Sequence, residues 1–330
     1  MVTFILAVSI ATAVVIQIAA VRACFTVYRL TAIHEKLRLS QTTPVAWKPF
    51  LRPSFASLPP LSQTLFRAIV FVPFGFISML VLVVVAGKVS RCASPVTALR
   101  IGRFCGKLVG WIAGVRKVEF RGRPAGTEEA PLVVANHLSW IDFIILGSTT
   151  RFGFVIGEAV STVPMIGKGF MELGELVGCI VLDRTCASSR EATKLRIKEK
   201  LHALKASGGS GYRLVVFSEG TLTNGESVVP LKLGAFEALV PSQPLRIELS
   251  NPHYSLASLK SIESICLFLS LPGTDVTMTW CEVVNPRIDE TVEDFAERVR
   301  LELVKGSKIS LAKTGSYRDH LQVCDNRNRQ

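Results

Sequence analysis

The stretch "PLVVANHLSWIDFIILGS" (131–148) joins two apolar runs through a short polar segment. The first run, 131–135, is uninterrupted, which is typical of a strand buried on both faces. The second run, 139–148, opens with Ser-x-x-Asp, a capping box that places Asp142 at the third helical position. The stretch therefore predicts a buried strand followed by a helix, with His137 at their junction.

The same alternation of short apolar runs and longer amphipathic ones continues to about residue 310. Strands that alternate with helices predict an α/β fold with a mostly parallel central sheet flanked by helices. We expect this domain to span 125–310 and the polar tail, 311–330, to fray. The further predicted strands are 152–157, 179–183, 212–217, 245–249 and 275–284, and the further predicted helices are 188–207 and 289–306.

The N-terminal part is much more apolar than the rest. Residues 2–21 and 68–87 are two runs of twenty residues without a charge, about the length that crosses a bilayer as a helix. We expect a transmembrane anchor at 1–23, a Pro-rich connector at 24–65 and a second membrane segment at 66–87. A signal peptide is the alternative for the first run, although it lacks a charged leading region.

The second membrane segment is predicted either to span the membrane or to re-enter it. Pro73 and Gly75 lie early in the segment, where a helix would kink. Basic residues flank it on both sides, which a simple crossing does not favour. We therefore expect the segment to dip into the membrane and return, which leaves 88–330 in the cytosol.

The net charge of +12 is concentrated just after this segment. Between 88 and 124, basic residues alternate with apolar ones at roughly helical spacing, as in a helix that lies on an anionic membrane surface. An ordinary core-facing helix with a solvated basic face is the alternative. No recognised nucleic-acid motif accompanies the charge, so we expect no nucleic-acid partner.

The eight cysteines include no C-x-x-C pair, and several lie in apolar runs. This pattern indicates free thiols in a reducing compartment, with no disulfide framework and no metal site.

Polar side chains gather where predicted strands end, the edge at which open α/β sheets bind ligands. His137 can take a proton if it stands before the helix and Asp142 orients it, or it can be a plain turn residue beside a cap. "FSEGTLTNG" (217–225) exposes backbone N–H groups and hydroxyls to a phosphate or a hydroxyl-bearing head group, or is ordinary turn chemistry. Arg184, after the strand "CIVLD", can bind phosphate through two hydrogen bonds, or pair with Asp183.

Together, these stretches resemble the motifs of the glycerolipid acyltransferase family, in the same order. The family motifs are N-H-x-x-x-x-D, G-x-x-F-x-x-R, F-P-E-G-T and V-P-x-K-x-G, and the corresponding stretches are 136–142, 178–184, 217–221 and 228–236. The longer pattern "EGTLTNG" is most similar to the lysophosphatidylcholine and lysophosphatidylethanolamine acyltransferase branch. Ser218 and Val181 depart from the family's Pro and Phe, which puts the chain or head-group preference in doubt more than the activity.

The resemblance implies transfer of an acyl chain from acyl-CoA to the free hydroxyl of a lysophospholipid. His137 would be the general base and Asp142 its partner, with acyl-CoA as co-substrate and neither cofactor nor metal. The protein would also contact membrane lipids. It would lie in the endoplasmic reticulum membrane, with the catalytic domain facing the cytosol. The implied substrate-binding residues are Asn136, Ser139, Arg184, Glu219, Gly220, Thr221 and Lys232.

Three alternatives share these motifs: a CoA-independent transacylase, a glycerol-3-phosphate or lysophosphatidic acid acyltransferase, and a non-catalytic lipid-binding membrane protein. The intact His137 and Asp142 disfavour the last, because a binding protein needs no base. A hydrolase is disfavoured because the chain contains no G-x-S-x-G.

Overall fold

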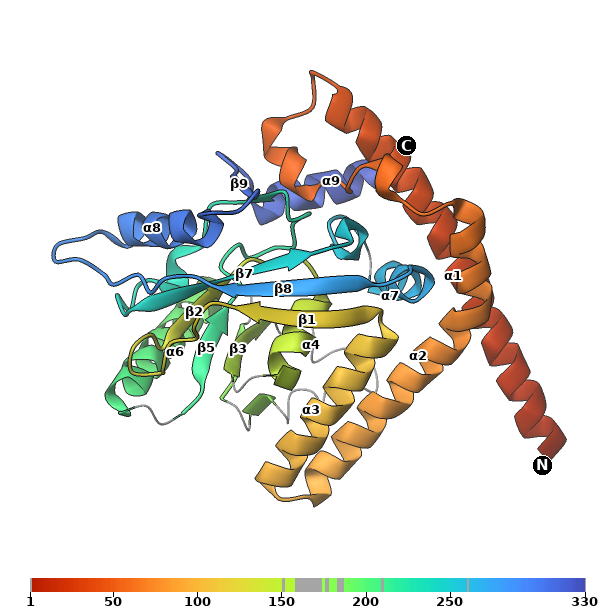
Figure 1. Cartoon of the computed structure of the whole chain (residues 1–330), viewed down its shortest axis with the longest axis horizontal. Coiled ribbons are helices and arrows are strands. Elements are labelled where there is room, and N and C mark those ends of the chain that lie inside the picture. The colour runs from red at the N-terminus through yellow and green to blue at the C-terminus, as the bar shows by residue number, and fades with distance from the viewer. Residues whose placement is uncertain are drawn as a thin grey trace.

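The computed structural model describes residues 2–149, 152–157, 174–175, 178–182, 187–208, 211–259 and 261–329. Its centre is a seven-stranded sheet with the order β1-β8-β7-β2-β5-β3-β4 (Figure 1). The strands are β1 Val115–Arg121, β2 Leu132–Ala135, β3 Phe152–Gly157, β4 Ile180–Leu182, β5 Arg213–Val216, β7 Ser242–Leu249 and β8 Thr274–Trp280.

Most neighbouring strands are parallel. β7, β2, β5, β3 and β4 share one direction. β8 is antiparallel to β7, and β1 is parallel to β8. The predicted fold class, a mostly parallel sheet flanked by helices, is confirmed.

Helices pack on both faces of the sheet, and β2 supplies both cores. Its alternate residues Val133 and Ala135 lie in one core, and Leu132 and Val134 lie in the other. This explains why its sequence is apolar throughout, since a strand covered on both faces has no solvated side. The first core contains α4 (Trp140–Thr149), and the second contains α6 (Ala187–Ala206) and α8 (Val292–Val304).

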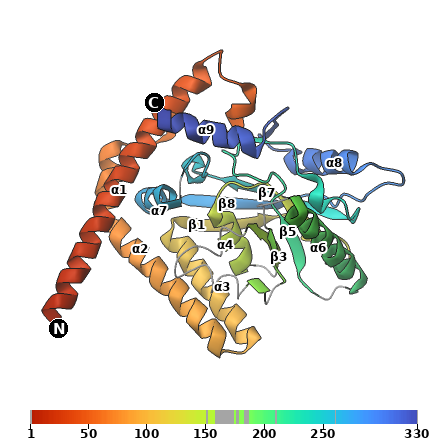
Figure 2. The same ribbon diagram turned by 180° about the vertical axis from the view of Figure 1, so that it is seen from behind.

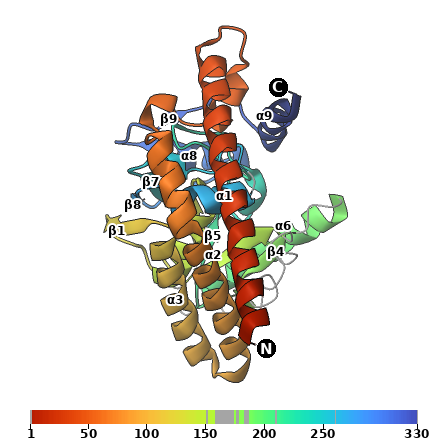
Figure 3. The same cartoon turned by 90° about the vertical axis from the view of Figure 1, so that its right-hand side faces the viewer.

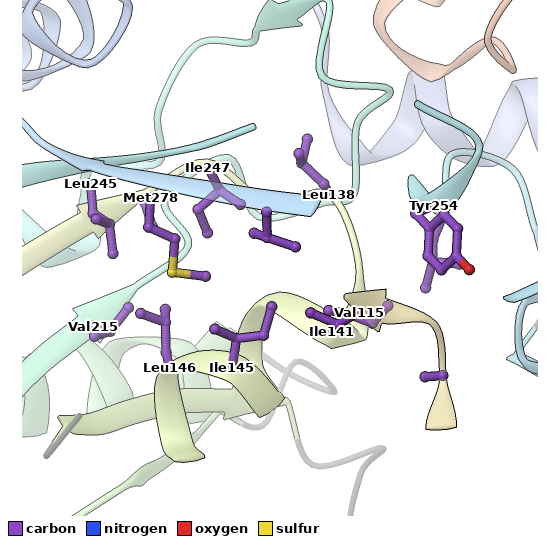
Figure 4. Packing of buried hydrophobic residues seen from close by; sticks show 14 of the residues in the cluster. Val115, Leu138, Ile141, Ile145, Leu146, Val215, Leu245, Ile247, Tyr254 and Met278 are labelled. Atoms are coloured by element: carbon purple, nitrogen blue, oxygen red, sulfur yellow. The ribbon is translucent and has the colours of Figure 1, made fainter. Parts of the chain in front are cut away.

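The first core holds α4 against the sheet. Figure 4 shows Ile141, Ile145 and Leu146 of this helix facing Val215, Leu245, Ile247 and Met278. The spacing of these α4 residues places them on one side of the helix. The start of α4, where Asp142 lies, is thereby fixed beside the ends of β2 and β5.

Two long helices precede the domain. They are α1 (Val2–Leu39) and α2 (Leu61–Cys92), and Ala11–Leu39 and Leu61–Val89 within them are long and apolar enough to span a membrane. Figure 3 shows both helices on one side of the molecule; they pack together over part of their length and diverge in Figure 1 toward the N-terminus and the α2–α3 turn. The anchor predicted to end at residue 23 continues as helix to Leu39, so the predicted connector begins inside a helix. The rest of the connector includes two short 3-10 helices, η1 (Val45–Phe50) and η2 (Phe55–Ser57).

The predicted hairpin within 66–87 is wrong, because α2 runs as one helix through Pro73. A proline frees the carbonyl four residues before it, here that of Ile69. Gln17 of α1 donates its side-chain amide to this carbonyl at 3.0 Å. The chain does turn back, but through a second helix, α3 (Pro95–Ile112), which packs along α2. In Figure 1 the α2–α3 turn extends away from the sheet.

The region 88–124 is only partly the predicted interfacial helix. α3 buries Ala98, Cys105 and Val109 and exposes Phe104 and Trp111, each by more than 60%. The following residues form β1, which pairs with β8 at one edge of the sheet. The domain therefore begins before the predicted boundary at 125.

The C-terminal tail is also ordered, contrary to the predicted fraying. A short parallel pair joins β6 (Ser227–Val228) to β9 (Ser310–Leu311), and helix α9 (Tyr317–Arg329) follows. Val323 of α9 is 1% exposed and packs with Phe50 and Leu51 of the connector. Figure 2 shows α9 lying across the molecule near α1. One remaining helix, α7 (Ser261–Ser270), packs against α1 and α2.

Candidate active site

The motifs at the ends of β2 and β5 meet because the two strands are parallel neighbours in register, with Val134 opposite Val216. His137 follows one strand and Glu219 follows the other. The backbone N–H of His137 donates to Oε2 of Glu219 at 2.8 Å. Two segments 82 residues apart in the chain are thus joined at the carboxyl edge of the sheet.

His137 and Asp142 form a hydrogen-bonded pair. Nδ1 of His137 lies 3.0 Å from Oδ2 of Asp142, whose side chain is fully buried. The same oxygen accepts the backbone N–H groups of Leu138 at 2.7 Å and Ser139 at 2.8 Å. The carboxylate therefore caps the start of α4 and orients the imidazole at the same time, so the two interpretations of this motif are compatible.

The imidazole is held on one face and open at one end. Its ring stacks on Phe217, with 4.1 Å between ring centroids, and the side chain is 24% exposed. Since Nδ1 is bonded to Asp142, Nε2 is the nitrogen left to face a substrate. The geometry suits a base whose tautomer is set by a buried acceptor.

The loop that carries His137 is fixed by its backbone as well. The His137 carbonyl accepts a hydrogen bond from the N–H of Thr223 at 3.0 Å, and the Leu138 carbonyl accepts one from the N–H of Leu256 at 2.7 Å. With the Glu219 bond, three hydrogen bonds from two segments of the chain hold a stretch of two residues. Such a loop cannot shift without breaking several hydrogen bonds at once.

Asn136 and Ser139, predicted to bind substrate, have their polar atoms engaged within the protein. Asn136 donates to the Ile247 carbonyl at 2.9 Å and accepts from the Ile247 N–H at 2.7 Å, which extends the β2–β7 ladder by a side chain. Oγ of Ser139 accepts from the N–H of Ile141 at 3.2 Å. Both residues are buried, so the structure places them in the support of the loop.

Glu219 is fully buried, and its two oxygens accept from His137 and Val229, the second at 3.2 Å. Burial raises the pKa of Glu219 to about 8, because a charged carboxylate loses its hydration there. Gly220 follows at φ +66°, where a side chain would be strained. Both oxygens of Glu219 therefore contact the backbone of the protein, one of them in the His137 loop, and its predicted acceptor contact stays a prediction.

The remaining predicted substrate-binding residues, Thr221, Lys232 and Arg184, differ in their surroundings. Oγ1 of Thr221 lies 2.7 Å from Nδ1 of His320 in α9, and Thr221 is only 7% exposed. Lys232 is exposed, and its side chain lies over Gly220. Arg184 and Asp183 lie outside the described residues. In the part of the chain that the structure describes, no cluster of His, Cys, Asp and Glu could hold a metal ion.

An apolar cavity that the sequence analysis missed lies behind α4, with a volume of about 170 Å³. It lies between α2, α3, α4 and β3, and its lining includes Leu99, Gly106, Phe143, Phe152 and Phe154. A Cβ at Gly106 would approach the Cβ of Ser148 to 3.1 Å, so a glycine is needed for α3 to lie this close to α4. Gly102, Gly106 and Gly110, spaced by four, are the signal in the sequence.

Comparison with known proteins shows what the central part of the chain is similar to. Residues 117–248 match the family model described as Acyltransferase. This match covers 132 of the 330 residues, and that part of the chain is similar to the acyltransferase family. The predicted recognition is confirmed, including the branch, because the curated relatives matched include several named lysophospholipid or lysophosphatidylcholine acyltransferases.

Three relatives illustrate the range. Lysophospholipid acyltransferase LPEAT2 of Arabidopsis thaliana is 30% identical over 47% of this chain and 27% of its own length. Lysophosphatidylcholine acyltransferase 2 of Danio rerio is 26% identical over 81% of this chain and 53% of its own length. Lyso-ornithine lipid O-acyltransferase of Pseudomonas aeruginosa is 35% identical over 42% of this chain and 51% of its own length. The matches therefore span about a quarter to a half of these relatives.

A solved structure shares the fold. The 1-acyl-sn-glycerophosphate acyltransferase PlsC from Thermotoga maritima aligns with a TM-score of 0.52 over 74% of this chain and 95% of that chain, at 18% identity. At this identity the likeness establishes the arrangement of helices and strands alone.

Proposed function

We propose that this protein transfers an acyl chain from acyl-CoA to the free hydroxyl of a lysophospholipid, with His137 as general base. The observation that carries the proposal is the His137–Asp142 pair, which is held between two strand ends with Nε2 left open. The names of the relatives support acyl transfer onto lysophospholipids.

In the proposed reaction, Nε2 of His137 takes the proton from the acceptor hydroxyl as its oxygen attacks the thioester carbonyl. The new ester C–O bond forms and the C–S bond breaks. The imidazolium returns its proton to the sulfur, so CoA leaves as the thiol. Asp142, 3.0 Å from Nδ1, stabilises the positive ring between these two steps. A base positioned in this way contributes about 10²–10⁴-fold to the rate.

Substrate binding is assigned to groups outside this pair. Arg184 is proposed to bind the lysolipid phosphate, and the exposed Lys232, whose side chain lies over Gly220, is proposed as a second cation for the same group. The apolar cavity behind α4 begins at Phe143, the residue after Asp142, and is proposed to accept part of an acyl chain. Asn136, Ser139 and Glu219, whose polar atoms are engaged, support the loop.

The membrane is the proposed source of the acceptor. α1 and α2 each contain a stretch that could span a bilayer, and α3 exposes aromatic residues among basic ones. We propose that the domain lies on the cytosolic side of the endoplasmic reticulum membrane, because α3 returns the chain along α2 toward the side where basic residues follow the first apolar run.

The full chain, purified in detergent or nanodiscs, tests the proposal. Labelled acyl-CoA is offered with a panel of lysophospholipids, lysophosphatidic acid and glycerol 3-phosphate. The control for His137→Ala is His202→Ala, which changes an exposed histidine of α6. We expect ester formation with a lysophospholipid, loss of at least a hundredfold in His137→Ala, and full activity in His202→Ala.

Other outcomes point to the alternatives. Preference for lysophosphatidic acid or glycerol 3-phosphate would indicate the phosphatidic-acid-forming reaction. Transfer from a labelled phospholipid without acyl-CoA would indicate a transacylase. More than a tenth of the activity in a folded His137→Ala variant would show that His137 is not the base.

A further inference from the structure

Helix α9, at the C-terminal end of the chain, covers the turn that holds Glu219 from the side away from the sheet. Val323 of this helix packs in a small core with Phe50 and Leu51 of the connector and with Val229. Nε1 of Trp47 also donates to Oε1 of Gln322 at 3.3 Å. The helix is therefore docked by both apolar and polar contacts, although its sequence is largely polar.

His320 connects this helix to the turn. Its Nδ1 lies 2.7 Å from Oγ1 of Thr221. Its ring stacks on Phe50, with 5.5 Å between centroids and 25° between planes, and meets Tyr317 edge to face. Burial lowers the pKa of His320, so the ring is neutral at neutral pH and can pair with a hydroxyl without an accompanying anion.

Two routes lead from this contact to Glu219. Thr221 is separated from Glu219 only by Gly220, whose φ of +66° fixes the turn. Val229, which packs in the same small core as Val323, donates its N–H to Oε1 of Glu219. The other oxygen of Glu219 accepts from the backbone of His137. A displacement of α9 therefore reaches the His137 loop through two chain segments.

We propose that His320 is a positioning residue that holds the Glu219–Thr221 turn, and through it the backbone of His137, in the arrangement needed for acyl transfer. The catalytic consequence rests on the proposed function. A purely apolar residue at 320 could cover the same surface, but it would leave the Thr221 hydroxyl buried without a partner. The hydrogen bond also makes Thr221 a link between segments instead of a group offered to the acceptor.

The test compares His320→Ala, His320→Asn and His320→Gln with Leu321→Ala, which changes an exposed neighbour on the same helix. An asparagine amide lies near the position of Nδ1, whereas a glutamine amide reaches toward Nε2. We expect kcat to fall about three- to tenfold in the Ala and Gln variants, the range for loss of one neutral hydrogen bond. Activity should recover largely in His320→Asn and be unchanged in Leu321→Ala, with both KM values constant.

A double-mutant cycle tests the link itself. Thr221→Val should reproduce the loss seen in His320→Ala, and the double variant should be no slower than either. Additive losses, or a higher KM for the acceptor in Thr221→Val, would assign Thr221 to substrate binding and overturn the proposal. A loss in His320→Ala that Asn does not restore would also overturn it.

Hydrogen exchange provides a measurement independent of activity. Peptides containing 137–142 and 217–223 should exchange faster in His320→Ala than in Leu321→Ala, with the rest of the sheet unchanged. Equal exchange in the two variants, or faster exchange throughout the domain, would show that His320 does not specifically hold the turn. If the wild-type chain transfers no acyl group at all, the proposed function fails, and this comparison still decides whether His320 positions the loop.

Discussion

Replacing Asp142 by Asn separates the charge of this side chain from its hydrogen bonds. All three of its hydrogen bonds, to Nδ1 of His137 and to the N–H groups of Leu138 and Ser139, end on Oδ2. Oδ1 is buried and has no hydrogen-bond partner among the described residues. An asparagine with its oxygen at the Oδ2 position keeps these three hydrogen bonds and loses the negative charge, while its NH2 group takes the place of Oδ1, where the described residues offer no acceptor.

The expected cost falls on the transition state. A hydrogen bond to a charged group is worth about 1.5–3 kcal/mol and one between neutral groups about 0.5–1.5 kcal/mol. A full Coulomb interaction over 3.0 Å at an effective dielectric constant of about 20 sets an upper bound of about 5.5 kcal/mol. Since the imidazole becomes positive only during the reaction, we expect kcat to fall about ten- to a hundredfold in Asp142→Asn.

Stability distinguishes this variant from Asp142→Ala. Alanine leaves the N–H groups of Leu138 and Ser139 without their acceptor, at about 1–3 kcal/mol each. We therefore expect a clear drop in Tm for Asp142→Ala and a smaller drop for Asp142→Asn, whose NH2 group replaces Oδ1 and has no acceptor among the described residues. The measurements are acyl transfer at saturating substrates and thermal unfolding in the same detergent.

Two results would refute this reasoning. If Asp142→Asn keeps more than half of the wild-type kcat, the charge of the carboxylate is not used in the reaction. If Asp142→Ala is as stable as the wild type, the two backbone hydrogen bonds do not support the start of α4.

Three further predictions concern other parts of the chain. Arg184→Ala should raise the KM for the acceptor about ten- to a hundredfold and leave the KM for acyl-CoA nearly unchanged, and Arg184→Lys should restore the acceptor KM in part. Equal effects on the two KM values would contradict a phosphate contact. Because burial raises the pKa of Glu219 from 4.5 to about 8, its contribution to stability is complete below pH 4.5 and is lost as the pH rises through 8, so the Tm of the wild type should fall over this range. The variant Glu219→Gln should show a flatter dependence of Tm on pH, and an equally steep fall would contradict the prediction. Deleting residues 1–87 should lower Tm and cause aggregation without detergent, because α7 loses its contacts with α1 and α2 and Asn224 loses the carbonyls of Lys48 and Leu51. A fragment 88–330 as stable as the full chain would contradict this.

Much of the fold could be predicted because its signals are local. The uninterrupted apolar run of β2 and the helical spacing in α4 and α8 each depend on residues a few positions apart. The errors arose where a distant partner overrides a local signal. Pro73 indicates a break, yet α2 continues because Gln17, 52 residues away in the chain, satisfies the freed carbonyl of Ile69.

The ends of the predicted domain were misplaced for a related reason. β1 lies in a basic stretch that alone suits a membrane surface, and it becomes a strand because β8, more than 150 residues later, provides its hydrogen bonds. The polar tail is a helix because the few apolar residues it has, such as Val323, find a small core beside the connector. Neither partner can be identified from the composition of the segment itself.

The candidate site divides in the same way. The sequence by itself predicted the His137–Asp142 pair as one of two possibilities, because a spacing of five residues brings the two side chains within reach when His137 precedes the helix that carries Asp142. Only the tertiary structure decided which protein groups Asn136, Glu219 and Thr221 contact. Their partners lie 111, 82 and 99 residues away, and they meet through the order of the strands and the packing of α9. Spacing along the chain fixes contacts within one turn, whereas strand order and packing select every partner beyond it.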